Sequence, residues 1–280
     1  MDERGVCDDC VSRLTELERV PPTVGNVIVG AVGLVPKVGL PALLLVTGVA
    51  LAMYFLRHEA FGIPFLGWGL DVAAQGVMLG LAHRAIHGRP VNLAATAQAT
   101  TDHLFRLIFV AFIAHIQIVV LYAIPSLLVL FVVSQMSPDA LLPALAVAQI
   151  AGLVLALWRA STLAVALPVT LHEGHTGFSA LGISTRRMKE HRAPAFVFAL
   201  AGLAWLIVPL VHEALTLGLS MIGWLGDLVD LGPLRPWTEQ LVELAPVIEI
   251  SQSVLTAVAL LFMTATSAVL YAKTVGYRVY

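Results

Sequence analysis

The sequence predicts an all-α integral membrane protein, a six-helix bundle accompanied by short amphipathic helices at the membrane interface. Apolar residues make up 59% of the chain and charged residues only 12%, about half the roughly 25% that a soluble domain carries. Six apolar segments approach or exceed the roughly 20 residues that a helix needs to cross the hydrocarbon core. Lysine and arginine gather in the connections on one side of these segments, which predicts an oriented, multi-pass chain.

The N-terminal segment, residues 1–22, is polar and acidic and is expected to be a cytoplasmic tail. Cys7 and Cys10 lie in it with the spacing of half a zinc site. A structural zinc site needs four ligands, so we expect either reduced thiols or a half-site that another chain completes. The apolar segment 24–35 follows and is too short to span a bilayer. We expect an interfacial or re-entrant helix there.

The transmembrane domain is expected to cover residues 23–280, with spans placed by apolar length and by turn residues. The expected spans are residues 36–56, 64–86, 103–133, 140–171, 194–221 and 246–272. A surface helix is expected over residues 91–102, between the second and third spans. Gly76 and Gly80 predict a close helix approach in the second span, and Pro125 predicts a kink or tilt in the third.

The charge distribution predicts the orientation. Of the 16 lysine and arginine residues, only Arg57 and Arg235 fall on the side of the bundle away from the termini. Because cytoplasmic connections carry the excess of lysine and arginine, both termini are expected in the cytoplasm. The expected location is therefore the cytoplasmic (inner) membrane of a prokaryote.

The connection between the fourth and fifth spans predicts a basic amphipathic helix at the inner headgroup level. Phe178, Leu181, Thr185 and Met188 recur at intervals of three and four residues, the spacing of one helix face. Basic residues lie off that face, where anionic headgroups would add about 1 kcal/mol each. The candidate lipid-binding or partner-binding residues are Arg159, Glu173, Arg186, Arg187, Lys189 and Arg192. The alternative is a topology anchor without a specific site.

Glu173 lies where the fourth span meets the cytosol and is flanked by His172 and His175. We expect it to pair with Arg159 or with a basic residue of the following connection. Such a pair would pin the connection against the bundle, which is a structural role rather than a catalytic one.

Polar side chains inside the expected spans raise the question of transport, because they must face the bundle interior or a wet cavity. The polar-core candidates are Asp71, Gln75, His115, His212, Glu213 and Glu249. Interhelical hydrogen bonds are the simpler account of them. A wet cavity reaching Asp71 and His115 would favour transport, whereas an apolar groove between helices would favour binding of lipid or of a partner.

A further pattern surrounds the fourth connection, where an apolar segment with proline precedes a glutamate, an Ala-Leu pair, a serine and arginines. The residues are Trp158, Arg159, Pro168, Glu173, Ala180, Leu181, Ser184, Arg186, Arg187 and Arg192. In this order they resemble the membrane domain found beside glycerophosphodiester phosphodiesterases in bacteria and archaea. The resemblance implies a six-helix membrane module, often free-standing. It implies no hydrolysis, because that activity belongs to a separate soluble barrel in fused relatives. At residues 183–185 the chain has Ile-Ser-Thr, where the family usually has Ser-Trp.

The sequence contains no glycine-rich nucleotide loop, nucleophile elbow or zinc-protease motif. We therefore expect a non-catalytic membrane scaffold or accessory protein that needs no cofactor and binds no nucleic acid. Membrane lipids are the expected partners, together with another membrane or cytosolic protein or a second copy of the chain. A small transporter or channel is the alternative.

Overall fold

The computed structural model of the chain describes residues 21–59, 64–133, 138–204, 255–256 and 258–275. Every regular element in these ranges is a helix, so the predicted all-α class is confirmed for them. Three helices are long and apolar enough to cross a membrane: Leu104–Val132, Pro143–Glu173 and Val258–Val275. Six spans remain a prediction, because the described helices at the expected first and second spans are not among these three, and most of the expected fifth span lies outside the described residues.

The chain divides into two compact units, and the elements below belong to the unit formed by Met1–Leu200 and Leu261–Tyr280. Its first helix, α2, covers Val24–Glu59. The backbone N–H of Thr23 donates to Asn26 Oδ1 at 2.8 Å, and the N–H of Asn26 donates to Thr23 Oγ1 at 3.3 Å, the reciprocal pattern of a capping box. The helix then runs without a break through two prolines. The expected boundary before residue 36 therefore does not occur, since a membrane helix can tolerate the hydrogen bond that proline removes.

Helix α3 covers Pro64–Ile86, which are the predicted bounds of the second span. Two residues after its end, Gly88 has a left-handed φ of 63°. The N–H of Arg89 donates to the Arg84 carbonyl oxygen at 2.8 Å, which closes the helix end in a Schellman motif. Helix α4, Leu93–Thr101, is the predicted surface helix and begins at an Asn92 cap.

The predicted close approach at Gly76 and Gly80 is confirmed. A Cβ on Gly76 would lie 2.8 Å from Thr100 Cγ2 and from Leu107 Cδ1, and a Cβ on Gly80 would lie 2.5 Å from Thr96 Cγ2. These distances are shorter than van der Waals contact, so a larger side chain at either position would force Thr96, or Thr100 and Leu107, to move.

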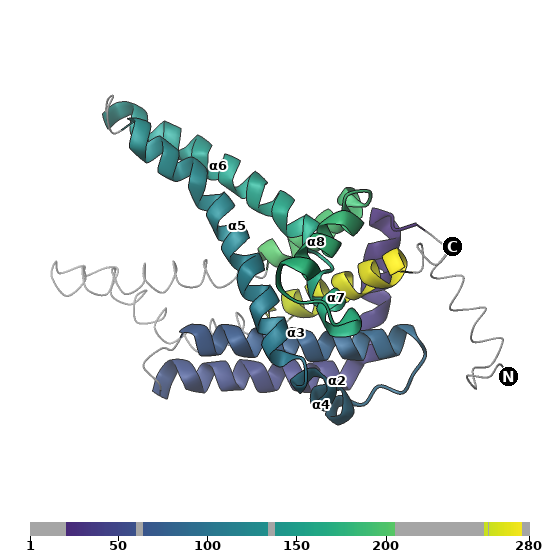
Figure 1. Ribbon diagram of the computed structural model, residues 1–280. Coiled ribbons are helices and arrows are strands. Elements are labelled where there is room, and N and C mark those ends of the chain that lie inside the picture. The colour runs from purple at the N-terminus through teal and green to yellow at the C-terminus, as the bar shows by residue number, and fades with distance from the viewer. Residues whose placement is uncertain (1–20, 60–63, 134–137, 205–254, 257, 276–280) are drawn as a thin grey trace, which may run out of the picture. The chain divides into compact units, whose positions relative to one another are not determined.

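Helices α5, Leu104–Val133, and α6, Pro138–Thr162, pack along each other and extend as a pair away from α2 and α3 (Figure 1). Gly152 lies directly against the Tyr122 backbone. Gln149 adds polar contacts: its Nε2 donates to Ser126 Oγ at 2.9 Å, and its Oε1 accepts from the Tyr122 hydroxyl. The third predicted span is therefore a helix that packs along much of its length against the fourth.

The fourth predicted span corresponds to the membrane-competent segment Pro143–Glu173, which a turn at residues 163–165 divides into α6 and α7, Ala166–Glu173. Pro168 gives the physical reason. It has no N–H to donate to the Ala164 carbonyl four residues earlier, and its ring clashes with that carbonyl. Helix α8, Gly177–Met188, follows a left-handed Gly174.

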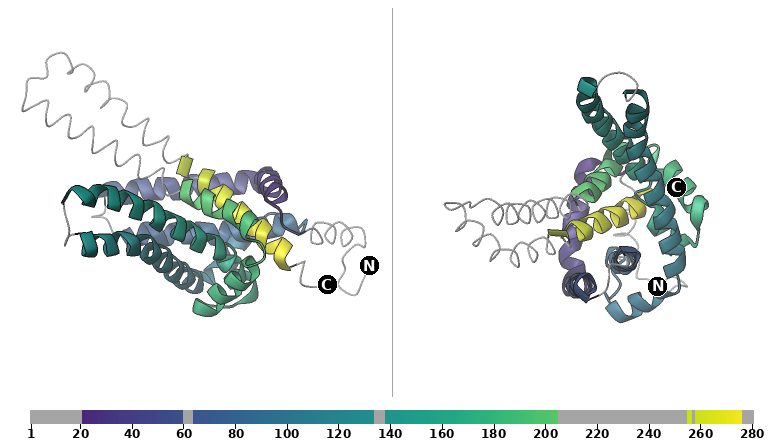
Figure 2. Two further views of the ribbon diagram at one scale, coloured as in Figure 1. Left: turned by 90° about the horizontal axis from the view of Figure 1, so that it is seen from above. Right: turned by 90° about the vertical axis from the view of Figure 1, so that its left-hand side faces the viewer.

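The core lies where α2, α3, α7, α8 and the C-terminal helix meet. On α2 the buried residues are Val27, Ala31, Leu34, Val38 and Ala42, which recur every three or four positions on one face. The C-terminal helix, Val258–Val275, contributes Leu270 and Tyr271 to the same core. Figure 2 shows this helix, in yellow, between purple α2 and teal α5.

Candidate functional site

The turn between α6 and α7 is closed by two serines from other helices. The Ser184 hydroxyl of α8 donates to the Thr162 carbonyl oxygen at 3.0 Å and accepts from the Val165 N–H at 3.3 Å. Ser267 donates to the Ala164 carbonyl oxygen at 2.5 Å. These groups are buried, and an unpaired backbone group in hydrocarbon costs several kcal/mol. Helix α8 is therefore attached to the bundle by polar bonds as well as by apolar contacts.

The guanidinium of Arg159 forms hydrogen bonds that join helices. Its Nε donates to Gln117 Oε1 on α5 at 3.0 Å, and its Nη1 donates to the hydroxyls of Thr162 at 3.2 Å and Thr185 at 3.3 Å. An arginine at this depth of a membrane-competent helix needs such partners. Arg159 therefore links α5, α6 and α8, and it is not the partner of Glu173.

Glu173 pairs with Arg187 of α8, which is one of the two predicted arrangements. Arg187 Nη2 donates to Glu173 Oε2 at 2.9 Å, and Nη1 bonds Oε1. This two-pronged geometry is typical of an arginine bonded to a carboxylate. The two side chains are only 11% and 25% exposed, and the Tyr271 ring centroid lies 5.8 Å from the guanidinium carbon, within cation–π range. The pair pins the connection after α7 to the bundle.

A stack of histidine rings lies beside this ion pair. The centroids of His83 and His172 are 4.0 Å apart, those of His83 and His87 are 4.3 Å apart, and His172 lies 5.4 Å from Tyr271. Within the described ranges no three histidine, cysteine, aspartate or glutamate residues are grouped so as to hold a metal ion. His83 and His87 lie four residues apart at the end of α3, but no sequence signal predicts that His172 of α7 stacks on them.

The outward face of α8 carries aromatic and basic side chains together. The buried residues of α8 are Gly177, Ala180, Leu181, Ser184 and Met188. At about 100° per residue, Phe178, Arg186 and Lys189 fall on the other side and are exposed, Phe178 by 73%. The residues of the predicted apolar face therefore do not share one environment, because Leu181 and Met188 are buried and Phe178 is exposed. The small side chains of Ala180 and Ser184 meet the bundle instead, because they allow the helix to come close.

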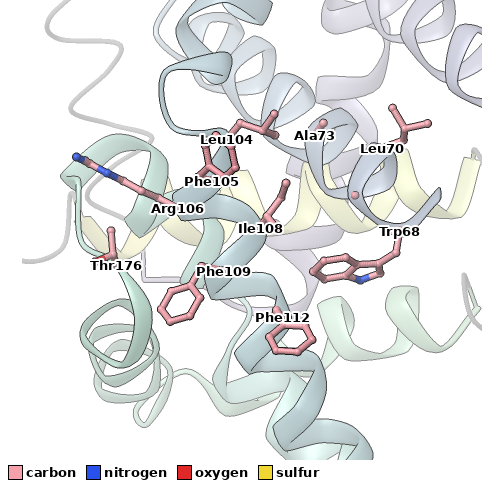
Figure 3. A pocket seen from close by; sticks show the side chains of 11 residues that line it. Trp68, Leu70, Ala73, Leu104, Phe105, Arg106, Ile108, Phe109, Phe112 and Thr176 are labelled. Carbon is pink, nitrogen blue, oxygen red and sulfur yellow. The ribbon is translucent and has the colours of Figure 1, made fainter. Parts of the chain in front are cut away.

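An apolar groove of about 950 Å³ opens between α3 and α5 (Figure 3). Its walls include Trp68, Leu70 and Ala73 from α3 and Phe105, Ile108, Phe109 and Phe112 from α5. Arg106 and Thr176 lie at one end and Trp68 lies at the other. The sequence did not predict this groove. Its lining residues are interspersed along α3 and α5 with other apolar residues that do not line it.

The polar-core candidates are only partly described. Gln75 is buried, and Asp71 is half-buried and has an interaction partner. His115 Nδ1 lies 2.8 Å from the Ala111 carbonyl oxygen, and its ring meets the edge of Trp68 with centroids 5.5 Å apart. His115 therefore packs against Trp68. His212, Glu213 and Glu249 lie outside the described residues, as do Cys7 and Cys10.

No family model, curated protein or solved structure matches this chain. The resemblance to the membrane domain beside glycerophosphodiester phosphodiesterases therefore stays a prediction. What the chain can do must be argued from its own residues, and the two features that face outward are the surface of α8 and the groove.

Proposed function

We propose that this chain is a non-catalytic membrane protein whose cytoplasmic face binds anionic lipid through the outward face of α8. The observation that carries the proposal is the common exposure of Phe178, Arg186 and Lys189 on a helix whose opposite side is bonded to the bundle. An interfacial helix binds by burying apolar side chains and by attracting anionic headgroups. Three helices long and apolar enough to cross a membrane would hold this face at a bilayer.

In this proposal the chain has six spans in the cytoplasmic membrane and both termini inside the cell. The support is the distribution of cationic side chains, of which only Arg57 and Arg235 lie on the far side. The resemblance to a six-helix membrane module, carried by the residues around Glu173 and Ser184, agrees with this arrangement.

The binding surface is held in place before lipid arrives. Ser184 bonds α8 to the turn after α6, and Arg187 bonds it to Glu173. A free amphipathic segment would have to fold as it binds, and that ordering weakens binding. Because α8 is already ordered, the full attraction of Arg186 and Lys189 is available to headgroups.

Transport is the second candidate, and the described polar residues favour it less. Gln117 is bonded to Arg159, and Gln149 to Tyr122 and Ser126, so these side chains join helices to one another. The groove between α3 and α5 is lined by apolar side chains, the feature that distinguishes lipid or partner binding from transport.

The test compares two triple variants of the full chain in vesicles of equal parts phosphatidylglycerol and phosphatidylcholine. Arg186→Gln with Lys189→Gln and Arg192→Gln removes three exposed charges, whereas Arg186→Lys with Lys189→Arg and Arg192→Lys keeps them. At about 1 kcal/mol per basic residue at the membrane surface, removal should weaken the preference for anionic lipid by up to about 3 kcal/mol.

The measurement is the ratio of phosphatidylglycerol to phosphatidylcholine that stays bound after extraction in mild detergent. The charge-keeping variant should match the wild type, and the neutral variant should show a lower ratio. An unchanged ratio in the neutral variant would refute the proposal.

A further inference from the structure

We infer that the groove between α3 and α5 holds one acyl chain of a phospholipid whose phosphate binds Arg106. This inference rests on the proposed function in one respect, that the chain lies in a bilayer. It uses none of the residues of α8, so the two proposals can fail separately.

The lining of the groove selects an apolar occupant. Its walls are aromatic and aliphatic side chains, and two of them, Phe105 and Phe109, are 87% and 54% exposed. One wall is the start of Leu104–Val132, a segment apolar and long enough to lie in a membrane. A groove there opens toward acyl chains rather than toward water. Its volume of about 950 Å³ is in the range of small-molecule binding sites.

A positively charged side chain, that of Arg106, lies at one end of the groove. Arg106 is exposed and has no ion pair or hydrogen bond to any residue in the described ranges. Its side chain extends from α5 past Thr176, whose hydroxyl-bearing side chain borders the same end (Figure 3). A guanidinium matches the oxygens of a phosphate with two parallel N–H groups. Charge complementarity therefore favours an anionic phospholipid over a neutral apolar ligand.

The distance from Arg106 to the apolar end of the groove suits a phospholipid oriented along the membrane normal. From Arg106 to Phe112 the groove follows α5 for six residues, about 9 Å at 1.5 Å per residue. In the predicted orientation, α5 starts at the cytoplasmic surface and enters the hydrocarbon. The phosphate would thus lie at the headgroup level while the acyl chain passes Phe109 and reaches Trp68.

The segment at residues 176–177 packs closely against the wall of the groove. Gly177 has a φ of 55°, and a Cβ on it would lie 3.1 Å from Phe109 Cε1. The loop that carries Thr176 therefore packs onto an aromatic wall residue, in a backbone conformation that glycine adopts without strain.

Quenching of tryptophan fluorescence by brominated acyl chains tests the inference, because Trp68 lies at the deep end of the groove. The full chain is placed in phosphatidylcholine vesicles with rising mole fractions of brominated phosphatidylglycerol or brominated phosphatidylcholine. The difference between wild type and Trp68→Phe isolates the signal of Trp68. We expect half-quenching at a roughly tenfold lower mole fraction of the anionic lipid, and loss of most of that preference in Arg106→Gln, since a charge-assisted hydrogen bond is removed.

Two further variants keep the test decisive. Ala73→Phe fills the groove and should reduce quenching by either lipid, even if Arg106→Gln folds poorly. The neutral triple variant of α8 should leave the Trp68 preference unchanged. Equal quenching by both headgroups, or an unchanged preference in Arg106→Gln, overturns the inference and leaves the α8 proposal standing. Loss of the Trp68 preference in the α8 variant alone also overturns it, because headgroup selection would then reside on α8.

Discussion

Replacing Gly152 by alanine should force α5 and α6 apart. The new Cβ would overlap the Tyr122 carbonyl oxygen and lie 3.1 Å from its carbonyl carbon and 3.3 Å from its Cα. These are backbone atoms, so no rotamer change can move them away. Ordinary contact between carbon atoms is about 3.5–4.0 Å, and the two helices would have to separate by roughly 1 Å to restore it.

The cost has two parts. Adding a methyl group to a close-packed site costs about 1–3 kcal/mol. Separation of the helices also weakens the bonds from Gln149 to Tyr122 and Ser126, each worth about 0.6 kcal/mol by the average found for such bonds in a membrane protein. We therefore expect Gly152→Ala to lower the free energy of unfolding by about 2–4 kcal/mol.

The assay is reversible unfolding of the full chain in mixed micelles, followed by circular dichroism. Gly33→Ala is the matched control: Gly33 also lies inside a long apolar helix, but no atom lies within 4 Å of its added Cβ. That variant should be neutral or up to about 1 kcal/mol more stable, because alanine is the better helix former. Equal stabilities of the two variants would contradict the close approach of α5 and α6.

The remaining predictions concern the contacts that position α4, α7 and α8, and each is read as the change in unfolding free energy in the same micelles. Gly80→Ala should destabilise by about 1–3 kcal/mol, and Thr96→Ser should restore the loss by removing the clashing Cγ2; failure of this rescue would contradict the packing of α4 on α3. Ser184→Ala should cost about 1–3 kcal/mol, because it leaves two buried backbone groups without a partner. Exposed Ser179→Ala should cost little, and equal losses would exclude a special role of the α6–α7 turn. Glu173→Gln should cost about 1–3 kcal/mol by leaving a largely buried arginine without its counter-charge; unchanged stability would mean that this ion pair does not hold α7 to α8.

Local signals in the sequence were sufficient to predict where several helices begin and end. The bounds of α3 follow from an apolar segment that begins at a proline and ends before Gly88. Helix α4 follows from the Asn92 cap and the polar, alanine-rich segment after it. The close approach at Gly76 and Gly80 follows from the small residues alone. Each of these signals depends on near neighbours in the chain.

Other local signals needed the tertiary structure to be interpreted correctly. Pro168 marks a break in the fourth span, yet whether a break is tolerated depends on Ser184 and Ser267, which come from elsewhere in the chain. Glu173 could pair with Arg159 or with any basic residue of the following connection, and the packing of α8 selected Arg187. The spacing of apolar residues in α8 placed Phe178 on one face with Leu181 and Met188, whereas the fold buries Leu181 and Met188 together with the smaller Ala180 and Ser184 and leaves Phe178 exposed.

The amino-acid sequence by itself therefore determined that this chain is helical and rich in membrane-competent segments, and where several of its helices begin and end. The histidine stack around His83, the groove beside Trp68 and the outward face of α8 were decided only by tertiary structure. The physical reason is that a membrane helix is apolar on all sides, because it meets lipid on one face and other helices on another. Its hydropathy then does not mark the inward face, and small residues and polar bonds between distant segments determine which sides meet.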